Sequence, residues 1–178
     1  MENLTNQDEL FDVKGYLTRV INEKQAIELQ GLLEKCSDYC LLVDGYAPRP
    51  SAASDMITER PEGKAVEDKL LVGIYSQEKE MIGVLDAIRN YPRADDWWIG
   101  LMLIDPIHRN QGLGKKVIQS FKDWAKQRGV KWIFLGVVEV NEKARIFWQS
   151  VGFKEIMRQP PREFGILRHV VISMRHEL

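Results

Sequence analysis

The sequence predicts an α/β fold with an antiparallel N-terminal part and a parallel β-α-β unit at its centre. One observation is that strand-like and helix-like segments alternate, with short joints, through the second half of the chain. Another is that two apolar runs, Lys69–Tyr75 and Met81–Ile88, flank a short polar segment, which is typical of an antiparallel hairpin. With 178 residues, the chain has the length of one domain, and we expect residues 1–178 to form a single domain.

Composition and charge narrow the classes of function. The chain is 44% hydrophobic and 29% charged, and its 25 basic and 26 acidic residues leave a formal net charge of -1. Nucleic-acid binding depends on clustered Lys and Arg, so no nucleic-acid partner is expected. The longest apolar stretch, Trp97–Ile104, is far shorter than the roughly 20 residues that cross a bilayer. The first ten residues lack the basic and apolar regions of a secretory signal, so we expect a cytoplasmic protein with no membrane partner.

The N-terminal elements follow from periodicity and capping. Tyr16–Ile21 is predicted as a strand, and Asn22 with Gln25 forms a capping-box pattern that opens a helix. One apolar stripe on this helix consists of Ala26, Leu29, Leu33, Cys36 and Cys40. Residues 45–68 contain prolines and glycines among charges, and we expect loops with a short helix there.

The central unit is predicted from three consecutive segments. The strand Trp97–Ile104 stops at Asp105-Pro106, and apolar residues at helical spacing then begin at Leu113. Gly129 stands where a helix C-cap is expected, and Trp132–Val140 is again almost continuously apolar. Such a unit has a right-handed crossover and two parallel strands.

A second helix and two strands complete the prediction. Asn141 is a good N-cap for this helix, and Gly152 ends it. Phe153–Met157 and His169–Arg175 are predicted as the remaining strands.

Metal binding is not expected. The two cysteines, Cys36 and Cys40, fall on the apolar face of a helix, where buried reduced thiols are common. A metal site needs further ligands, and the three histidines show no metal-ligand spacing.

The segment Arg109–Gly114 carries the clearest chemical pattern. Gly112 and Gly114 allow the backbone to approach a ligand, and the first amides of the following helix have no partners within the helix. The helix dipole and Lys115 add positive charge, so a phosphate or pyrophosphate is the expected guest. A P-loop would need glycine at position 109, and a Rossmann fingerprint would need a small residue at position 117, so neither motif fits.

With these residues in view, the C-terminal half resembles the GNAT superfamily, the Gcn5-related N-acetyltransferases. The family has a strand ending in apolar-x-Pro and then R-x-x-G-x-G/A, matched here by Ile104-Asp105-Pro106 and by Arg109–Gly114. The family's second pattern, N-x-x-A with later aromatic and Gly-Phe residues, is matched by Asn141, Ala144, Phe147, Trp148, Gly152 and Phe153. The two motifs occur in the family's order and spacing, each on the predicted element.

The resemblance implies a mixed sheet whose central parallel strands splay apart to hold acetyl-CoA as a co-substrate. It divides the chain into an acceptor-side half, about 1–96, and a cofactor-binding half, about 97–178. The implied cofactor-binding residues are Met102, Leu103, Ile104, Arg109, Asn110, Gln111, Gly112, Leu113, Gly114, Lys115, Asn141, Ala144, Phe147 and Trp148. The backbone of residues 102–104 would bind the pantetheine arm, and the amides of residues 110–115 would bind the pyrophosphate.

The catalytic groups are less well defined. Family members often have a tyrosine where Trp148 stands, and an indole cannot protonate the departing thiolate at neutral pH. Glu139 is the one charged residue inside the strand Trp132–Val140, and Asp86 occupies a similar place in Met81–Ile88. We name Glu139 first and Asp86 second as candidate general bases, although either carboxylate is also explained by a strand end or a solvated face.

The sequence therefore predicts an N-acetyltransferase that acts on the amine of a small molecule by direct attack on acetyl-CoA. The alternatives are a protein N-terminal or lysine acetyltransferase and a non-catalytic acyl-CoA-binding module. Neither the acceptor nor the formation of a homodimer is determined by the sequence.

Overall fold

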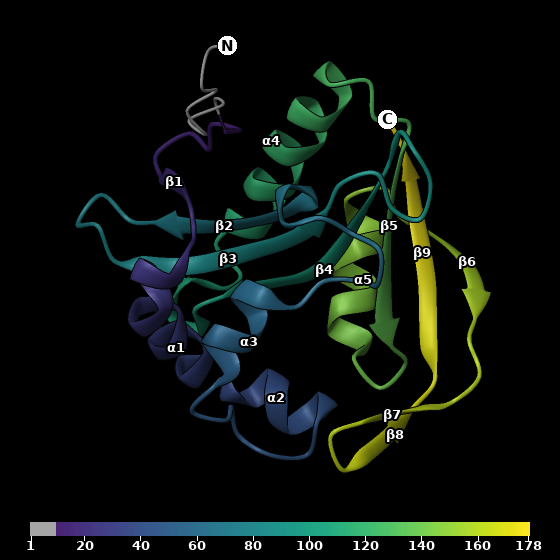
Figure 1. The fold of residues 1–178 in the computed structure, drawn as a ribbon, viewed down its shortest axis with the longest axis horizontal. Helices are drawn as coiled ribbons and strands as arrows, with labels where there is room; N and C mark the ends of the chain where they lie inside the picture. Colours follow the sequence, from purple (N-terminus) through teal and green to yellow (C-terminus); the bar gives the residue numbers. More distant parts are fainter. Residues whose placement is uncertain (1–9) are drawn as a thin grey trace.

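A computed structural model describes residues 10–178, which form a mixed sheet covered by helices on both faces (Figure 1). Within this part of the chain the sheet has seven strands in the order β1-β2-β3-β4-β5-β9-β6. Their bounds are β1 Leu17–Val20, β2 Lys69–Tyr75, β3 Met81–Ile88, β4 Asp96–Ile104, β5 Trp132–Val138, β9 Val171–Glu177 and β6 Lys154–Arg158. The pair β4-β5 is parallel, whereas every other neighbouring pair is antiparallel. This confirms the predicted α/β class with its parallel centre.

The helices form one layer on each face of the sheet. The helices on one face are α1 (Ala26–Lys35), α2 (Ser37–Val43) and α3 (Ala52–Thr58), and those on the other are α4 (Leu113–Gln127) and α5 (Glu142–Ser150). Short 3-10 turns occur at Glu23–Gln25, Val66–Asp68 and Pro106–His108. The capping box predicted at Asn22 and Gln25 is present. None of the helices formed by residues 10–178 is long and apolar enough to span a membrane.

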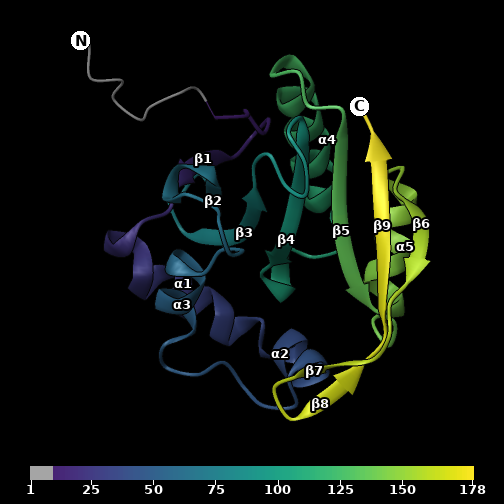
Figure 2. The same ribbon diagram turned by 45° about the vertical axis from the view of Figure 1, so that its right-hand side comes forward.

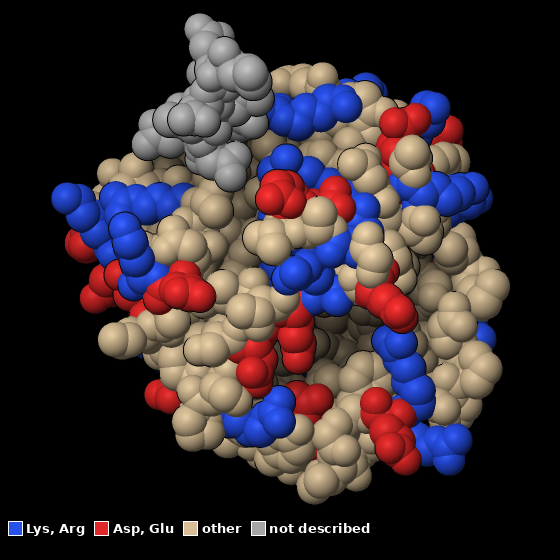
Figure 3. Space-filling view, in the orientation of Figure 1, with Lys and Arg blue, Asp and Glu red and all other residues tan. Residues whose placement is uncertain are grey.

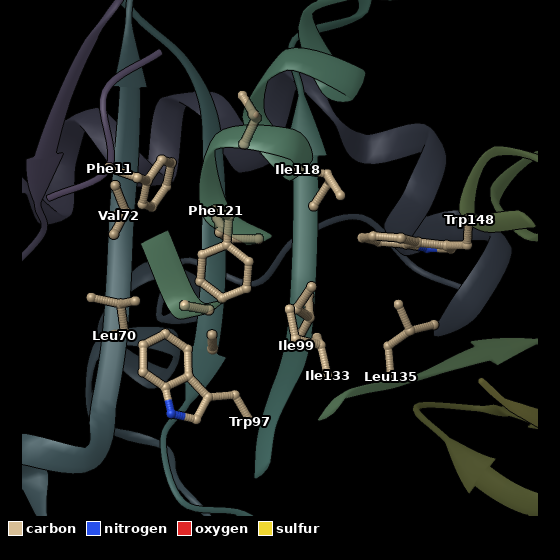
Figure 4. Packing of buried hydrophobic residues seen from close by; sticks show 14 of the residues in the cluster. Phe11, Leu70, Val72, Trp97, Ile99, Ile118, Phe121, Ile133, Leu135 and Trp148 are labelled. Atoms are coloured by element: carbon tan, nitrogen blue, oxygen red, sulfur yellow. The ribbon is translucent and has the colours of Figure 1, made fainter. Parts of the chain in front are cut away.

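The main core lies between the sheet and α4. Phe121 is fully buried, and its ring centroid lies 5.8 Å from that of Trp97 on β4 and 5.6 Å from that of Phe11. Figure 4 shows these rings beside Leu70 and Val72 of β2, so α4 packs across the strands on both sides of β4. This packing fixes the first turn of α4 at the end of β4.

The two parallel strands separate halfway along their length. β4 pairs with β5 only from Asp96 to Ile99, while its other edge pairs with β3 as far as Ile104. A bulge places Gly100 between the paired residues Ile99 and Leu101. The edge of β4 that faces β5 therefore has no strand partner from Gly100 onward, as the predicted splay requires.

The predicted first helix is two helices. The chain breaks at Cys36, where φ is -92° and ψ is 24°, and α2 then starts in a new direction. Cys36 is buried and its Sγ lies 3.5 Å from the carbonyl oxygen of Ile104, so a tertiary contact at the end of β4 holds the break. Cys40 is only partly buried.

The C-terminal region differs from its prediction by a small hairpin. β7 (Arg162–Phe164) and β8 (Leu167–His169) form a separate two-stranded sheet, so His169 ends β8 and β9 starts at Val171. Figure 2 shows this hairpin reaching from the C-terminal strands toward α2. The amide of Ile166 donates to the carbonyl oxygen of Asp44 at 2.9 Å. A ring nitrogen of His169 lies 2.9 Å from the carbonyl oxygen of Val43.

Other bounds differ slightly. The strand predicted as Trp132–Val140 ends at Val138, and α3 is the short helix predicted within residues 45–68. Residues 1–9, whose composition contributed to the expected cytoplasmic location, lie outside the described residues.

Candidate functional site

A cavity of about 190 Å³ opens where β4 and β5 separate. Its walls come from β4, β5 and the start of α5, together with α2, β7 and β9. Figure 3 shows the face of the molecule on which α1–α3 lie. This face is hollowed near its centre, and charged side chains of both signs surround the hollow. The cavity thus joins the predicted cofactor-binding half to the predicted acceptor-side half.

The turn before α4 has the geometry of an anion site. Gly112 has φ of 82° and Asn110 has φ of 61°, both in the left-handed region. A Cβ on Gly112 would meet no atom within 4 Å, so this residue faces open space. Within the described residues, the amides of residues 110–112 donate to no backbone carbonyl. With the unpaired amides of Leu113, Gly114 and Lys115 in the first turn of α4, they can hold a phosphate.

The second glycine of the motif has a different function. A Cβ on Gly114 would lie 3.2 Å from the ring of Phe147 and 3.6 Å from the terminal methyl of Met102. Gly114 therefore lets α5 pack tightly against the start of α4. This contact brings the two halves of the sequence motif together in space.

Two residues of the motif have side chains that bind the protein itself. The guanidinium of Arg109 donates to both carboxylate oxygens of Asp38 on α2, and its Nε donates to the carbonyl oxygen of Ile104 at 2.8 Å. The side-chain amide of Gln111 donates to the carbonyl oxygen of Ile107 at 2.8 Å. These side chains shape the loop and attach it to α2, which leaves backbone amides as its ligand-binding groups.

Of the residues that the sequence patterns place on α5 or at its N-cap, Asn141, Ala144 and Trp148 line the cavity, whereas Phe147 does not. Asn141 caps α5 by accepting a hydrogen bond from the amide of Ala144 at 3.1 Å, and both residues line the cavity. Trp148 also lines it and packs edge-on against Phe147 and Phe153. Its indole therefore belongs to an aromatic cluster that forms one wall of the cavity.

The three β4 residues that the resemblance assigns to the pantetheine arm lie in different surroundings. Met102 lines the cavity, whereas the side chains of Leu103 and Ile104 are buried in the two cores on opposite faces of the sheet. The carbonyl oxygen of Ile104 already accepts from Arg109 and faces Cys36. The cavity is lined by the β4 residues 98–102, of which Gly100–Met102 lie on the unpaired edge.

Asp86 lies on β3 beside Gly100, which lines the cavity. Both of its carboxylate oxygens accept from Nζ of Lys69, at 2.9 and 3.0 Å, and both side chains are largely buried. A Cβ on Gly100 would lie 3.6 Å from Oδ2 of Asp86, so the carboxylate is next to the bulge of β4. Burial raises the pKa of Asp86, with the nearby charge of Glu59 adding to the rise and Lys69 opposing it.

Glu139 lies in a more open position beyond the end of β5. Its two carboxylate oxygens are held by the guanidinium of Arg158 at 2.7 Å, and its side chain is 32% exposed. It is absent from the cavity wall. Asp86 does not line the cavity either, and each carboxylate adjoins a lining residue, Asp86 beside Gly100 and Glu139 after Val138. What distinguishes Asp86 is its deeper burial, which raises its pKa.

Several residues of the cavity wall are not part of the sequence motifs. Tyr39 of α2 and Phe164 and Arg162 of β7 line the same cavity. Burial raises the pKa of Tyr39 to about 12, and among the described residues no hydrogen-bond partner of its hydroxyl is found. The sequence did not predict Tyr39 in the site because the helix break at Cys36, which directs α2 toward the cavity, was not predicted. It did not predict β7 because this strand has only three residues.

The residues at and just before the start of β4 have different surroundings. Trp97 is in the core, whereas Trp98 lines the cavity and meets the ring of Tyr91 edge-on. Asp95 and Asp96 pair with Lys131 and Arg93. Within residues 10–178, no group of three or more His, Cys, Asp or Glu side chains is arranged to hold a metal ion.

Comparison with known proteins identifies the family of the chain. The sequence profile of the acetyltransferase (GNAT) family matches residues 38–153, which include β4, the glycine turn and α5. The chain belongs to the acetyltransferase (GNAT) family. A curated relative, Protein SPT10 of Saccharomyces cerevisiae, is 29% identical over 93 residues, which cover 51% of this chain and 14% of that protein. The family assignment confirms the resemblance found in the two motifs.

Solved structures share the fold over nearly the whole chain. An acetyltransferase from Thermus thermophilus has a TM-score of 0.74 at 22% identity, covering 93% of this chain and 99% of that one. Spermidine N-acetyltransferase from Vibrio cholerae, solved with CoA and spermine, has a TM-score of 0.72 at 16% identity, covering 92% and 95%. The ribosomal-protein-S18-alanine N-acetyltransferase of Escherichia coli has a TM-score of 0.65 at 17% identity, covering 91% and 93%.

Proposed function

We propose that this GNAT protein transfers the acetyl group of acetyl-CoA to the amine of a small molecule by direct attack. The observation that carries the proposal is the separation of β4 from β5, because it opens a cavity that the unpaired edge of β4 and the helix α5 line on one side and α2 and β7 on another. The residues fit the cofactor: the open space at Gly112 admits a phosphate, and the unpaired edge of β4 offers backbone groups to an amide-containing arm. The β7–β8 hairpin, fixed to α2, narrows the cavity and favours a small acceptor over a folded protein.

The proton from the amine is assigned to Asp86. Attack forms a C–N bond and breaks the C–S bond of the thioester, so the amine must lose a proton. A carboxylate with a raised pKa is a better acceptor for this proton than an ordinary one, and Asp86 adjoins the bulge at Gly100. Transfer proceeds directly or through one water.

The proton for the departing thiolate is assigned to Tyr39. A phenol whose pKa is about 12 stays protonated at neutral pH. Tyr39 lines the same cavity as Trp148, which has no acidic proton of that kind. Trp148, Ala144 and Asn141 then serve to bind and orient the acyl donor.

Two measurements test this function together. Calorimetry with CoA tests the donor site. Thiol release from acetyl-CoA with a panel of small amines and peptides, followed by mass detection of the acetylated product, tests turnover. CoA binding without thiol release from any amine would favour a non-catalytic acyl-CoA-binding module. Release with peptide amines alone would favour a protein acetyltransferase.

A further inference from the structure

The cavity contains one feature that bears on the choice of acceptor. Of the side chains that line it in the described part of the chain, Arg162 is the one that carries a charge. The remaining lining is apolar or aromatic, apart from the phenol of Tyr39, the amide of Asn141 and the indoles of Trp98 and Trp148. Arg162 is therefore the charged side chain that a ligand in this cavity can contact directly.

Arg162 is distinguished from other nearby arginines by its contacts. Arg158 pairs with Glu139, Arg109 with Asp38, and Arg145 with Glu155. No carboxylate within residues 10–178 lies within ion-pair distance of Arg162. Its guanidinium instead lies over the ring of Phe164, 4.9 Å from the ring centroid.

The hairpin holds this arginine in place. β7 pairs with β8 through Arg162 and His169, and a ring nitrogen of His169 lies 2.9 Å from the carbonyl oxygen of Val43 on α2. A Cβ on Gly45 would lie 2.6 Å from Cγ1 of Ile166, so the hairpin tip is tightly packed against the chain after α2. The guanidinium therefore sits on an anchored element at the exposed side of the cavity.

We propose that Arg162 binds an anionic group of the acceptor, so that the preferred substrates are small amines that also carry a carboxylate or a phosphate. The planar guanidinium donates in a fork that matches either anion, and stacking on Phe164 leaves its edge free to do so. A diamine would instead bring a second positive charge toward Arg162. This inference rests on the proposed acetyl transfer and specifies its substrate class.

The test compares matched amines in the wild-type protein. The pairs are alanine with alaninamide, 4-aminobutyrate with 1,4-diaminobutane, and O-phosphoethanolamine with ethanolamine, and the last pair separates phosphate from carboxylate recognition. We expect kcat/KM to be about 10- to 100-fold higher for the anionic member of at least one pair, which is the range of a charge-assisted hydrogen bond. A wild-type preference for 1,4-diaminobutane and alaninamide would overturn the proposal.

Variants then assign the preference to this side chain. Arg162→Gln is expected to remove it while the Kd for CoA stays unchanged, and Arg162→Glu to reverse it toward 1,4-diaminobutane. Arg168→Gln, on the neighbouring strand and outside the cavity wall, is the matched control and should keep the wild-type preference. A preference that survives Arg162→Gln, or a weaker Kd for CoA in that variant, would remove Arg162 from the acceptor site.

Equilibrium binding separates this inference from the proposed function. Calorimetry with the same amine pairs, on the protein alone and on the protein saturated with CoA, measures recognition without turnover. Tighter binding of the anionic amines that is lost in Arg162→Gln supports the inference even if no thiol is released. Equal affinity within every pair contradicts it, whatever the activity.

Discussion

At the scale of single residues, two carboxylates that look alike in sequence have different surroundings. Asp86 is largely buried against Lys69 and adjoins Gly100, whereas Glu139 is partly exposed and held by Arg158. The sequence favoured Glu139 because it lies at the carboxyl end of a predicted parallel strand, where open α/β sheets place their ligands. The surroundings of each carboxylate depend on where β5 ends and on the side chains that β2 and β6 place beside it. The hydrophobic periodicity of a strand does not predict these tertiary contacts.

Asp86→Asn is expected to lower kcat by about 100- to 10,000-fold, the usual contribution of a general base. Because the pKa of Asp86 is raised, the base is lost as pH falls through a value above its ordinary one, and the acidic limb of kcat/KM should lie there in the wild type. Initial rates across the pH range check this, with calorimetry to show that CoA still binds. Glu139→Gln is the control; if it alone loses activity, the base is Glu139.

The phenol of Tyr39 and the indole of Trp148 face the same cavity with different chemistry. Tyr39→Phe should lower kcat with little change in the Kd for CoA, because it removes the proton donor and keeps the ring. Trp148→Phe should keep a substantial fraction of turnover, because the indole acts by packing. Rates and calorimetry on both variants decide the matter. Equal losses in the two would contradict the assignment, and Tyr39→Phe/Trp148→Tyr should recover part of the lost kcat.

At the scale of elements, the periodicity of apolar residues and the capping residues predicted the strands β2, β3 and β4 and the helix α4 from the sequence. The break at Cys36 was missed because no glycine or proline marks it and the apolar stripe continues to Cys40. It forms through contacts with Ile104 and with Arg109, residues about seventy positions away. The donor side of the site was thus predictable from local motifs, while Tyr39 and Arg162 reach the cavity through tertiary contacts.

The turn before α4 provides a prediction at this scale. Gly112→Asp should weaken CoA binding severely, because a carboxylate would enter the space at the helix N-terminus and repel a phosphate. Gly112→Asn is the matched control, because its side chain has the same size as that of Asp but no charge. Asn and Asp both tolerate the left-handed backbone of this position better than other side chains do. Calorimetry should find a much larger loss for Asp than for Asn. Unchanged affinity in a folded Gly112→Asp protein would remove the cofactor from this turn.

At the scale of the whole molecule, two ion pairs connect the helices of the acceptor-side half to the end of β4. Lys35 at the end of α1 pairs with the buried Asp105 at 3.0 Å, and Asp38 of α2 pairs with Arg109. The amide of Ile107 also donates to Asp105 at 3.0 Å. These contacts hold α1 and α2 beside the cavity, so they position Tyr39 relative to the splayed strands.

Both carboxylates make this connection dependent on pH. Hydrogen bonds from Arg109 are the largest influence that lowers the pKa of Asp38. For Asp105, burial pushes the pKa upward, but the Ile107 amide and the Lys35 ammonium together outweigh it and leave the pKa lowered. A carboxyl whose folded-state pKa lies below its unfolded value stabilises the fold above the unfolded value, and this stabilisation is lost as pH falls through the folded value.

Asp105→Asn is therefore expected to lower the free energy of unfolding by about 1 to 3 kcal/mol at neutral pH, as for hydrogen bonds to a charged buried group. The difference from the wild type should start to shrink as pH falls below about 4, and it should vanish once pH falls below the lowered folded-state pKa of Asp105, where the wild-type carboxyl is also protonated. Urea unfolding of both proteins at several pH values measures it. Asp95→Asn, in the exposed pair with Lys131, is the control and should cost under about 1 kcal/mol. A loss for Asp105→Asn that is equal at neutral and acid pH would show that its charge does not hold the two halves together.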